Sequence, residues 1–269
     1  MLYHLPLRVS FALARETGLV GVELVLGPEA LVRGPEYIRT LTQQYDMPVT
    51  SVHPPIVPYP GMGNTRWVLP RLVQFAERVD APLVVLHTPK AVSEESSNWR
   101  GFVEAIEQFT GGAERSVRVS LENAGYYRPS DERYLLHDAR RLRAFADRYD
   151  LCLTLDTAHA GTSNRSLLET YDIVSERVIN IHVSDLVEST VIPRLQFLDT
   201  VFRHHQMPGR GHLALSQLVR QLRKRDYRGT CTLEMSPVAV KAWSLANVRQ
   251  ALGESISFIR EAEALQVAN

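Results

Sequence analysis

PLVVLH (residues 82–87), VRVSLE (117–122) and CLTLD (152–156) are short apolar runs that end on His, Glu and Asp. Two segments between them, Trp99–Thr110 and Asp131–Tyr149, repeat their apolar residues at the spacing of one helix face. Buried parallel strands are typically short and apolar, and parallel neighbours need a crossover, usually a helix. This stretch therefore predicts a βαβαβ unit with a parallel sheet.

The same alternation extends in both directions along the chain. Five further runs resemble buried strands: LYHLPL (2–7), GVELVL (21–26), PVTSVH (48–53), VINIHV (178–183) and CTLEM (231–235). Eight β-then-α units in about 250 residues predict an α/β fold, a single (β/α)8 TIM barrel, with residues 1–269 as one domain. The competing doubly wound sheet would show a glycine-rich turn after its first strand, and HLPLRVSFA has none.

The composition narrows the classes of partner. The chain has 30 Lys+Arg and 30 Asp+Glu, with 45% hydrophobic residues, which is typical of a globular protein. Zero net charge argues against nucleic acid as a partner, although it leaves room for a local basic patch. No apolar run approaches the roughly 20 residues of a membrane span. Two cysteines without metal-type spacing favour a reducing setting, so we expect a cytoplasmic protein.

Potential metal ligands fall at the carboxyl ends of six consecutive predicted strands. They are His53, His87, Glu122, Asp156, His182 and Glu234. Barrel enzymes keep their chemistry at this rim, whereas any one of these residues alone could be a solvated loop residue. Mixed imidazole and carboxylate ligands suit transition metals such as Zn or Mn. Converging carboxylates also repel one another unless a cation is bound, so we expect a divalent metal and a less stable metal-free protein.

Five segments carry a resemblance to a known family: VSLENAG, LTLDTAHAG, INIHVSD, HHQMPGRG and CTLEM. They are similar to the motifs of the xylose isomerase-like barrel superfamily, which includes AP endonuclease family 2, and the similarity covers nearly the whole chain. In the sugar isomerases and epimerases of this superfamily, the resemblance implies one metal. Its ligands would be Glu122, Asp156, His182 and Glu234. His159 and an arginine before the PGRG turn would then bind substrate.

The endonuclease IV branch implies up to three metals. His53 and His87 would join Glu122 on a first zinc, and Glu122 would bridge to a second zinc on the other ligands. His159 and an Asp-x-His pair would hold a third. His205 matches this pair, but Arg203 stands where the family has the aspartate, and an arginine cannot bind a cation. The number of metals, from one to three, therefore stays open.

The preferred interpretation is a metal-dependent isomerase or epimerase that acts on a sugar, sugar phosphate or related polyol by enediolate proton transfer. Glu122 and Glu234 would exchange the proton, with His159 as a third catalytic residue. Four residues would bind substrate hydroxyls or phosphate: His159, Arg203, His205 and Arg210.

Two alternatives remain. One is an endonuclease IV-like, zinc-dependent phosphodiester hydrolase with two or three metals, and the other is an inactive barrel that binds a metal or sugar. A homodimer that caps the pocket is also considered.

Glu23, inside GVELVL, is expected either to support a neighbouring ligand or to form a buried structural pair. The other histidines, among them His137 and His204, are expected to be structural.

Overall fold

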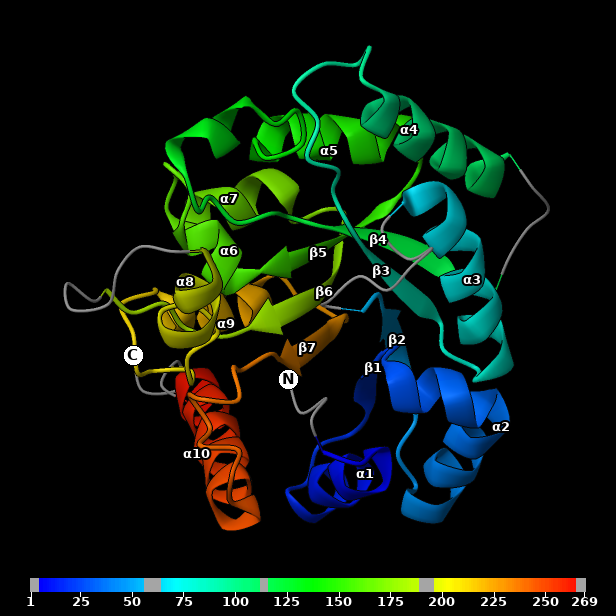
Figure 1. Cartoon of the computed structure of the whole chain (residues 1–269). Helices are drawn as coiled ribbons and strands as arrows, with labels where there is room; N and C mark the ends of the chain where they lie inside the picture. The colour runs from blue at the N-terminus through cyan, green and yellow to red at the C-terminus, as the bar shows by residue number, and fades with distance from the viewer. Residues whose placement is uncertain (1–4, 56–63, 112–115, 189–195, 265–269) are drawn as a thin grey trace.

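The computed structural model describes residues 5–55, 64–111, 116–188 and 196–264. Seven strands form one sheet in the order of the sequence, and each strand is parallel to its neighbours (Figure 1). The strands are β1 (Val22–Val25), β2 (Val49–His53), β3 (Leu83–His87), β4 (Arg118–Glu122), β5 (Cys152–Asp156), β6 (Val178–Val183) and β7 (Thr230–Leu233).

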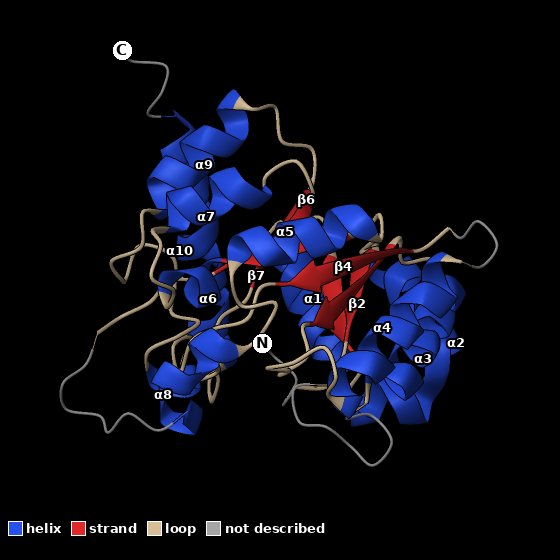
Figure 2. Ribbon diagram, turned by 90° about the horizontal axis from the view of Figure 1, so that it is seen from above, coloured by secondary structure: helices blue, strands red, loops and turns tan. Residues whose placement is uncertain are grey.

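Helices surround this sheet, as the view from above shows (Figure 2). They are α1 (Leu7–Glu16), α2 (Pro28–Tyr45), α3 (Thr65–Arg78), α4 (Ser97–Thr110), α5 (Ala139–Arg148), α6 (Thr157–Gly161), α7 (Leu167–Val174), α8 (Gln196–Phe202), α9 (Leu215–Lys224) and α10 (Leu245–Ala264), with a 3₁₀ helix η1 (Pro129–Arg133). The alternation gives a nearly closed barrel of parallel strands, so the predicted TIM-barrel fold class is confirmed.

Only the last three residues of the first predicted strand, LYHLPL, lie among the described residues, and they do not form a strand. Residues 1–4 lie outside the described residues, and Leu7 already begins α1. Pro6 stands immediately before this helix, and proline has no N–H to donate to a sheet. Leu7, Phe11 and Ala14 then follow one another at helical spacing, and all three contact the main apolar core. The described residues therefore contain seven strands rather than eight.

Strand alternation separates an apolar outer face from a polar interior. On β4, Val119 and Leu121 belong to the core beneath the helices, whereas Ser120 and Glu122 lie on the other face. Ser120 Oγ is 2.7 Å from Thr154 Oγ1 of β5, so small hydroxyl groups satisfy one another inside the barrel. The same alternation points the residues at the strand ends, such as Glu122, into the barrel.

The register places these strand ends at one level. His87 is paired with Glu122 across β3 and β4, and Asp156 with His182 across β5 and β6.

A mostly apolar cavity of about 230 Å³ lies between α1, β1 and β7, where the sheet comes closest to closing. Among the described helices, none has both the length and the apolar character needed to cross a bilayer.

Candidate metal centre

Three groups of potential ligands meet at the carboxyl ends of the strands. In each group the ligand atoms lie within 4.8 Å of one another. The groups are His53–His87–Glu122, Glu122–Asp156–His182–Glu234 and Asp156–His159–His205. Glu122 and Asp156 belong to two groups each, so all eight residues predicted as ligands lie in one continuous cluster, hereafter the ligand cluster.

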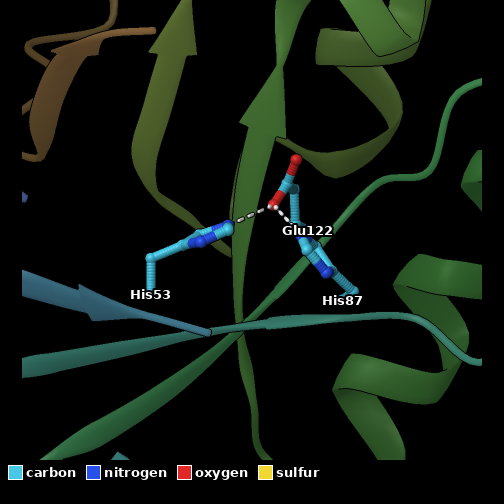
Figure 3. A group of neighbouring side chains, drawn as sticks. All are labelled: His53, His87 and Glu122. Atoms are coloured by element: carbon cyan, nitrogen blue, oxygen red, sulfur yellow. Dashed lines mark hydrogen bonds and ion pairs between the residues drawn. The ribbon is translucent and has the colours of Figure 1, made fainter. Parts of the chain in front are cut away.

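The first group joins strands β2, β3 and β4 (Figure 3). His53 Nε2 and His87 Nε2 each lie 3.4 Å from the same oxygen, Oε2 of Glu122. His53 Nδ1 is 2.7 Å from the carbonyl oxygen of Pro54, so this nitrogen donates and leaves the lone pair on Nε2. A backbone carbonyl commonly orients metal-binding histidines in this way. His53 is buried, whereas the His87 side chain is half exposed.

The second group fits a divalent cation. Three buried atoms in it have no hydrogen-bond partner among the described residues: His182 Nδ1, Asp156 Oδ2 and Glu234 Oε2. His182 Nδ1 lies 2.6 Å from Glu234 Oε2 and 3.8 Å from Glu122 Oε1. His182 Nδ1 and Glu234 Oε2 thus have only each other, and Asp156 Oδ2 has no partner among the described residues. Buried polar atoms in this state are costly, and a cation bound by all three would satisfy them. One imidazole and three carboxylates form a donor set that suits Zn or Mn.

Charges in the ligand cluster act differently on its carboxyl groups. Burial acts to raise the pKa of Glu122, but the charge of His87 and hydrogen bonds from His159 and other histidines lower it well below its usual value. Burial likewise opposes ionisation of Glu234, yet its interaction with His182 lowers the pKa strongly. The pKa of Asp156 is raised, mainly by burial. The cluster therefore keeps Glu122 and Glu234 ionised, as a proton acceptor requires.

Glu23 of β1 supports His182 from across the barrel. Its Oε1 lies 3.0 Å from His182 Nε2, and Ser51 Oγ of β2 donates to its other oxygen at 2.6 Å. Without a metal, burial acts to lower the pKa of His182, but the carboxylates of Glu23 and Glu234 outweigh it and raise this pKa well above its usual value. As a metal ligand, His182 would keep the proton on Nε2 and present the lone pair of Nδ1 to the second group. The sequence left two roles open for Glu23. Its contact with His182 is the one expected if Glu23 supports a metal ligand.

His159 is held on both ring nitrogens. Its Nδ1 lies 3.0 Å from the carbonyl oxygen of Asn123 and 3.1 Å from Glu122 Oε1, and its Nε2 lies 3.2 Å from the Tyr127 hydroxyl. His205 Nδ1 approaches Asp156 Oδ2 only to 3.8 Å. The third group thus has no contact as short as the 2.6 Å contact in the second, and both of its imidazoles have protein partners, since His205 Nδ1 also lies 3.4 Å from Ser184 Oγ.

Two residues that sequence reasoning missed position the ligand cluster. Asn123 exchanges hydrogen bonds with the backbone of Asp156, donating at 3.1 Å and accepting at 2.7 Å, and so ties β4 to β5. Asp185 accepts from the backbone N–H groups of Gly209 and Gly211 in the MPGRG turn and of Leu213 just after it, at 2.9–3.1 Å. Both lie inside quoted motifs, VSLENAG and INIHVSD, which were the available signal.

The two predicted arginines lie in different surroundings. Arg203 is buried and forms an ion pair with Asp199, one turn earlier at the end of α8. It lies directly before His204 and His205. Arg210 Nη2 instead donates to Glu254 of α10 at 3.0 Å, and its side chain is 67% exposed. The structure therefore does not bring Arg210 to the ligand cluster.

Comparison with known proteins identifies the family of the chain. Residues 11–262 match the model of the xylose isomerase-like TIM barrel family. The chain belongs to this family. This confirms the resemblance that the motifs indicated.

Relatives and solved structures match this chain over most of its length. An uncharacterised protein of Mycobacterium tuberculosis is 27% identical over 280 residues, which covers 96% of this chain and 93% of that protein. Fructoselysine 3-epimerase of Escherichia coli O157:H7 is 21% identical and covers 86% of each chain. The structure of D-allulose 3-epimerase from Methylomonas sp. superposes with a TM-score of 0.69 at 16% identity, over 95% of this chain and 90% of that one.

Proposed function

We propose that this protein is a divalent-metal-dependent isomerase or epimerase that acts on a sugar, sugar phosphate or related polyol. The observation that carries the proposal is the second group, in which buried ligand atoms converge without hydrogen-bond partners. Two of the named relatives, the fructoselysine and allulose 3-epimerases, act on carbohydrates. We further propose Zn or Mn as the metal, held by Glu122, Asp156, His182 and Glu234, and a cytoplasmic location.

The reaction follows from the placement of the two ionised glutamates. A bound metal would polarise a substrate carbonyl and stabilise negative charge on the adjacent oxygens. Glu122 and Glu234 come from β4 and from the end of β7, three strands apart in the sheet. One carboxylate can therefore remove a proton from carbon, while the other, once it has taken up a proton from water, returns one from a different side. His159, held by Asn123 and Tyr127, would orient a substrate hydroxyl.

The first test follows proton exchange at carbon. The metal-loaded protein is incubated in D2O with D-fructose, D-allulose and D-tagatose, and deuterium at the exchanging carbon is followed by NMR. We expect exchange with at least one ketose. Glu122→Gln and Glu234→Gln should each reduce it by about 10³-fold or more, because each removes a proton acceptor and a metal ligand. Their far-ultraviolet circular dichroism should match the wild type.

Loss of the fold in Glu122→Gln would make this residue structural instead. Unchanged exchange in both variants would contradict the assignment of the two glutamates as proton carriers. Glu107→Gln on the surface of α4 makes the same chemical change outside the ligand cluster and serves as the control.

A second candidate function is supported by the first group. Phosphodiester hydrolysis by two or three metals would use His53, His87 and Glu122 beside the second group. Elemental analysis after dialysis against Zn and Mn separates the two candidates. About one metal per chain supports the isomerase. Two or more metals, reduced by one in His87→Ala, together with hydrolysis of bis(4-nitrophenyl) phosphate, would support the hydrolase.

The third interpretation is an inactive barrel that binds a metal or sugar. It predicts that metal is retained while neither carbon exchange nor phosphodiester hydrolysis is detected. No metal at all would contradict both catalytic candidates.

A further inference from the structure

Tyr127, in the loop after β4, contacts His159 but does not belong to the ligand cluster. Its hydroxyl oxygen lies 3.2 Å from His159 Nε2, and the two rings meet edge-on with their centroids 6.3 Å apart. A hydroxyl can donate to a neutral imidazole or accept from a charged one, so the contact is favourable in both states of the ring. Tyr127 can therefore hold one end of the His159 ring.

The other ring nitrogen of His159, Nδ1, has three oxygens around it. They are the Asn123 carbonyl at 3.0 Å, Glu122 Oε1 at 3.1 Å and Asp156 Oδ1 at 3.8 Å. Nδ1 must carry a hydrogen here, because a lone pair on the nitrogen would face the lone pairs of these oxygens. His159 is consequently a hydrogen-bond donor toward Glu122.

The hydrogen at Nδ1 gives the two oxygens of Glu122 different surroundings. Oε1 lies beside His159, whereas Oε2 lies 3.4 Å from both His53 Nε2 and His87 Nε2. If the carboxylate turned away, the contact between Oε1 and His159 would be lost. A base works best when its oxygen keeps a fixed direction toward the proton that it removes, so a rigid His159 would speed that step.

Hydrogen bonds fix the backbone of the Tyr127 loop against α6 and η1. The N–H of Tyr126 donates to Thr162 Oγ1 at 2.8 Å, and that hydroxyl donates to the His159 carbonyl at 2.7 Å. Asp131 Oδ2 accepts from the N–H of Tyr127 at 2.9 Å. The phenol thus reaches His159 from a backbone that is anchored on both sides.

Two neighbours set the position of the Tyr127 ring. His204 stacks on it, with the ring centroids 4.9 Å apart and the planes 14° from parallel. Gly125 leaves the space in which the rings of Tyr127 and His159 meet. A Cβ there would lie 3.0 Å from His159 Cδ2 and 3.1 Å from Tyr127 Cε2, which is closer than ordinary contact.

We propose that Tyr127 is a positioning residue for the reaction. Its hydroxyl holds His159 with the Nδ1 hydrogen directed at Glu122 Oε1, and this contact orients the carboxylate that exchanges the proton. The role in the reaction rests on the proposed function, since it requires Glu122 to be a base. The hold on the His159 ring does not, and it can be measured without any substrate.

The first measurement follows the hydrogen at His159 Nδ1 by NMR. Full-length, zinc-loaded protein with ¹⁵N-labelled histidine is used, and His159→Gln identifies the His159 signals. Couplings to the ring hydrogens distinguish Nδ1 from Nε2. Tyr127→Phe keeps the ring that stacks on His204 but removes the hydroxyl. We expect the Nδ1 hydrogen of this variant to exchange with water about tenfold faster, the effect of one lost hydrogen bond.

The second measurement is deuterium exchange at carbon, with the ketose that exchanges fastest in the wild type. In Tyr127→Phe we expect kcat to fall about tenfold while KM changes by no more than about twofold, because Tyr127 acts through His159 rather than on the substrate. Gly125→Ala keeps both rings but drives them apart, and should change both measurements in the same direction. Tyr134→Phe removes the hydroxyl of a ring that packs on His137, and should change neither.

Three outcomes would overturn the proposal. If the Nδ1 hydrogen exchanges equally fast in Tyr127→Phe and wild type, the hydroxyl does not hold His159. If that hydrogen exchanges faster but kcat is unchanged, the contact does not serve the reaction. If KM rises and kcat does not fall, Tyr127 binds the substrate instead. A wild type that exchanges no ketose would contradict the proposed function and the role in the reaction with it, while the Nδ1 hydrogen would still show whether Tyr127 holds the ring.

Discussion

Histidine tautomers decide which atoms of the ligand cluster can bind a metal. His53 donates from Nδ1 to a backbone carbonyl and presents Nε2, whereas His182 donates from Nε2 to Glu23 and presents Nδ1. The same residue type thus offers opposite nitrogens because its second partner differs. At this scale, the sequence identifies the ligand types but not the atoms that they present.

Glu23→Gln should weaken Zn binding by about 10- to 100-fold, since the amide is a poorer partner for the His182 N–H and can turn its NH₂ toward it. Competition with a chromogenic chelator measures the affinity. Glu29→Gln, whose carboxylate accepts from the Leu7 N–H outside the ligand cluster, should leave affinity unchanged. Equal affinity in Glu23→Gln and wild type would show that Glu23 is only a structural partner.

His137 predicts a loss of stability in mild acid. Its folded pKa of about 4 lies below the unfolded value near 6.5, so only the unfolded chain takes up a proton between these values. Stability therefore falls as pH drops below 6.5. Allowing for partial solvent screening, we expect the wild type to lose about 1 kcal/mol more than His137→Phe between pH 7 and 5.5. Urea unfolding at both pH values measures this, and parallel losses would contradict it.

At the scale of elements, loops bring residues to the strand ends. Asp185 follows β6 and gathers the backbone of the MPGRG turn, while Asp185 and Gln206 exchange backbone hydrogen bonds at 2.8 and 2.9 Å. This arrangement places His205 beside Asp156 although about 50 residues of chain separate them. The two motifs INIHVSD and HHQMPGRG are therefore one structural unit.

Gly211→Ala should break this unit. A Cβ at Gly211 would overlap the Asp185 carboxylate and the Leu186 carbonyl oxygen. We expect a loss of about 2 kcal/mol in the free energy of unfolding, measured with urea. Gly253→Ala in α10 is the matched control, since no atom lies within 4 Å of its Cβ, and it should stabilise by about 0.5–1 kcal/mol. A Gly211→Ala variant as stable as wild type would contradict the role of Asp185.

At the scale of the whole molecule, the ligand cluster links strands across the barrel. Six of its eight residues lie on β2 through β6 and just after β7, and Glu23 adds β1 through His182. Side chains therefore join β1 to β6 across the interior, although no described backbone pairing joins β1 to β7. Local order at the ligand cluster and global stability should then be coupled.

Zinc should stabilise the entire fold. At a concentration about 100 times the Kd, we expect the free energy of unfolding to rise by about 2.7 kcal/mol, because the unfolded chain lacks the assembled ligands. Chelation should reverse the gain, and Glu234→Gln should largely lack it. Urea unfolding monitored by circular dichroism measures both. A wild-type curve that zinc does not move would contradict a metal centre built from these strands.

The sequence by itself determined the βα alternation and the positions of the potential ligands. Both follow from local rules, because apolar periodicity distinguishes strands from helices and parallel strands bring their carboxyl ends to one rim. It was wrong at the end of LYHLPL, where Leu7 already begins α1 after Pro6, while residues 2–4 lie outside the described residues. The xylose isomerase-like family also followed from motifs that lie at those strand ends.

Only the tertiary structure decided which ligands share a group, which nitrogen each histidine presents, and where the arginines lie. Arg210 stands in a motif, yet it pairs with Glu254, 44 residues away in α10. The Tyr127 hydroxyl likewise lies 3.2 Å from His159 Nε2, although 32 residues separate the two in the chain. Such properties depend on distances between segments remote in the chain, and no local pattern of residues encodes those distances.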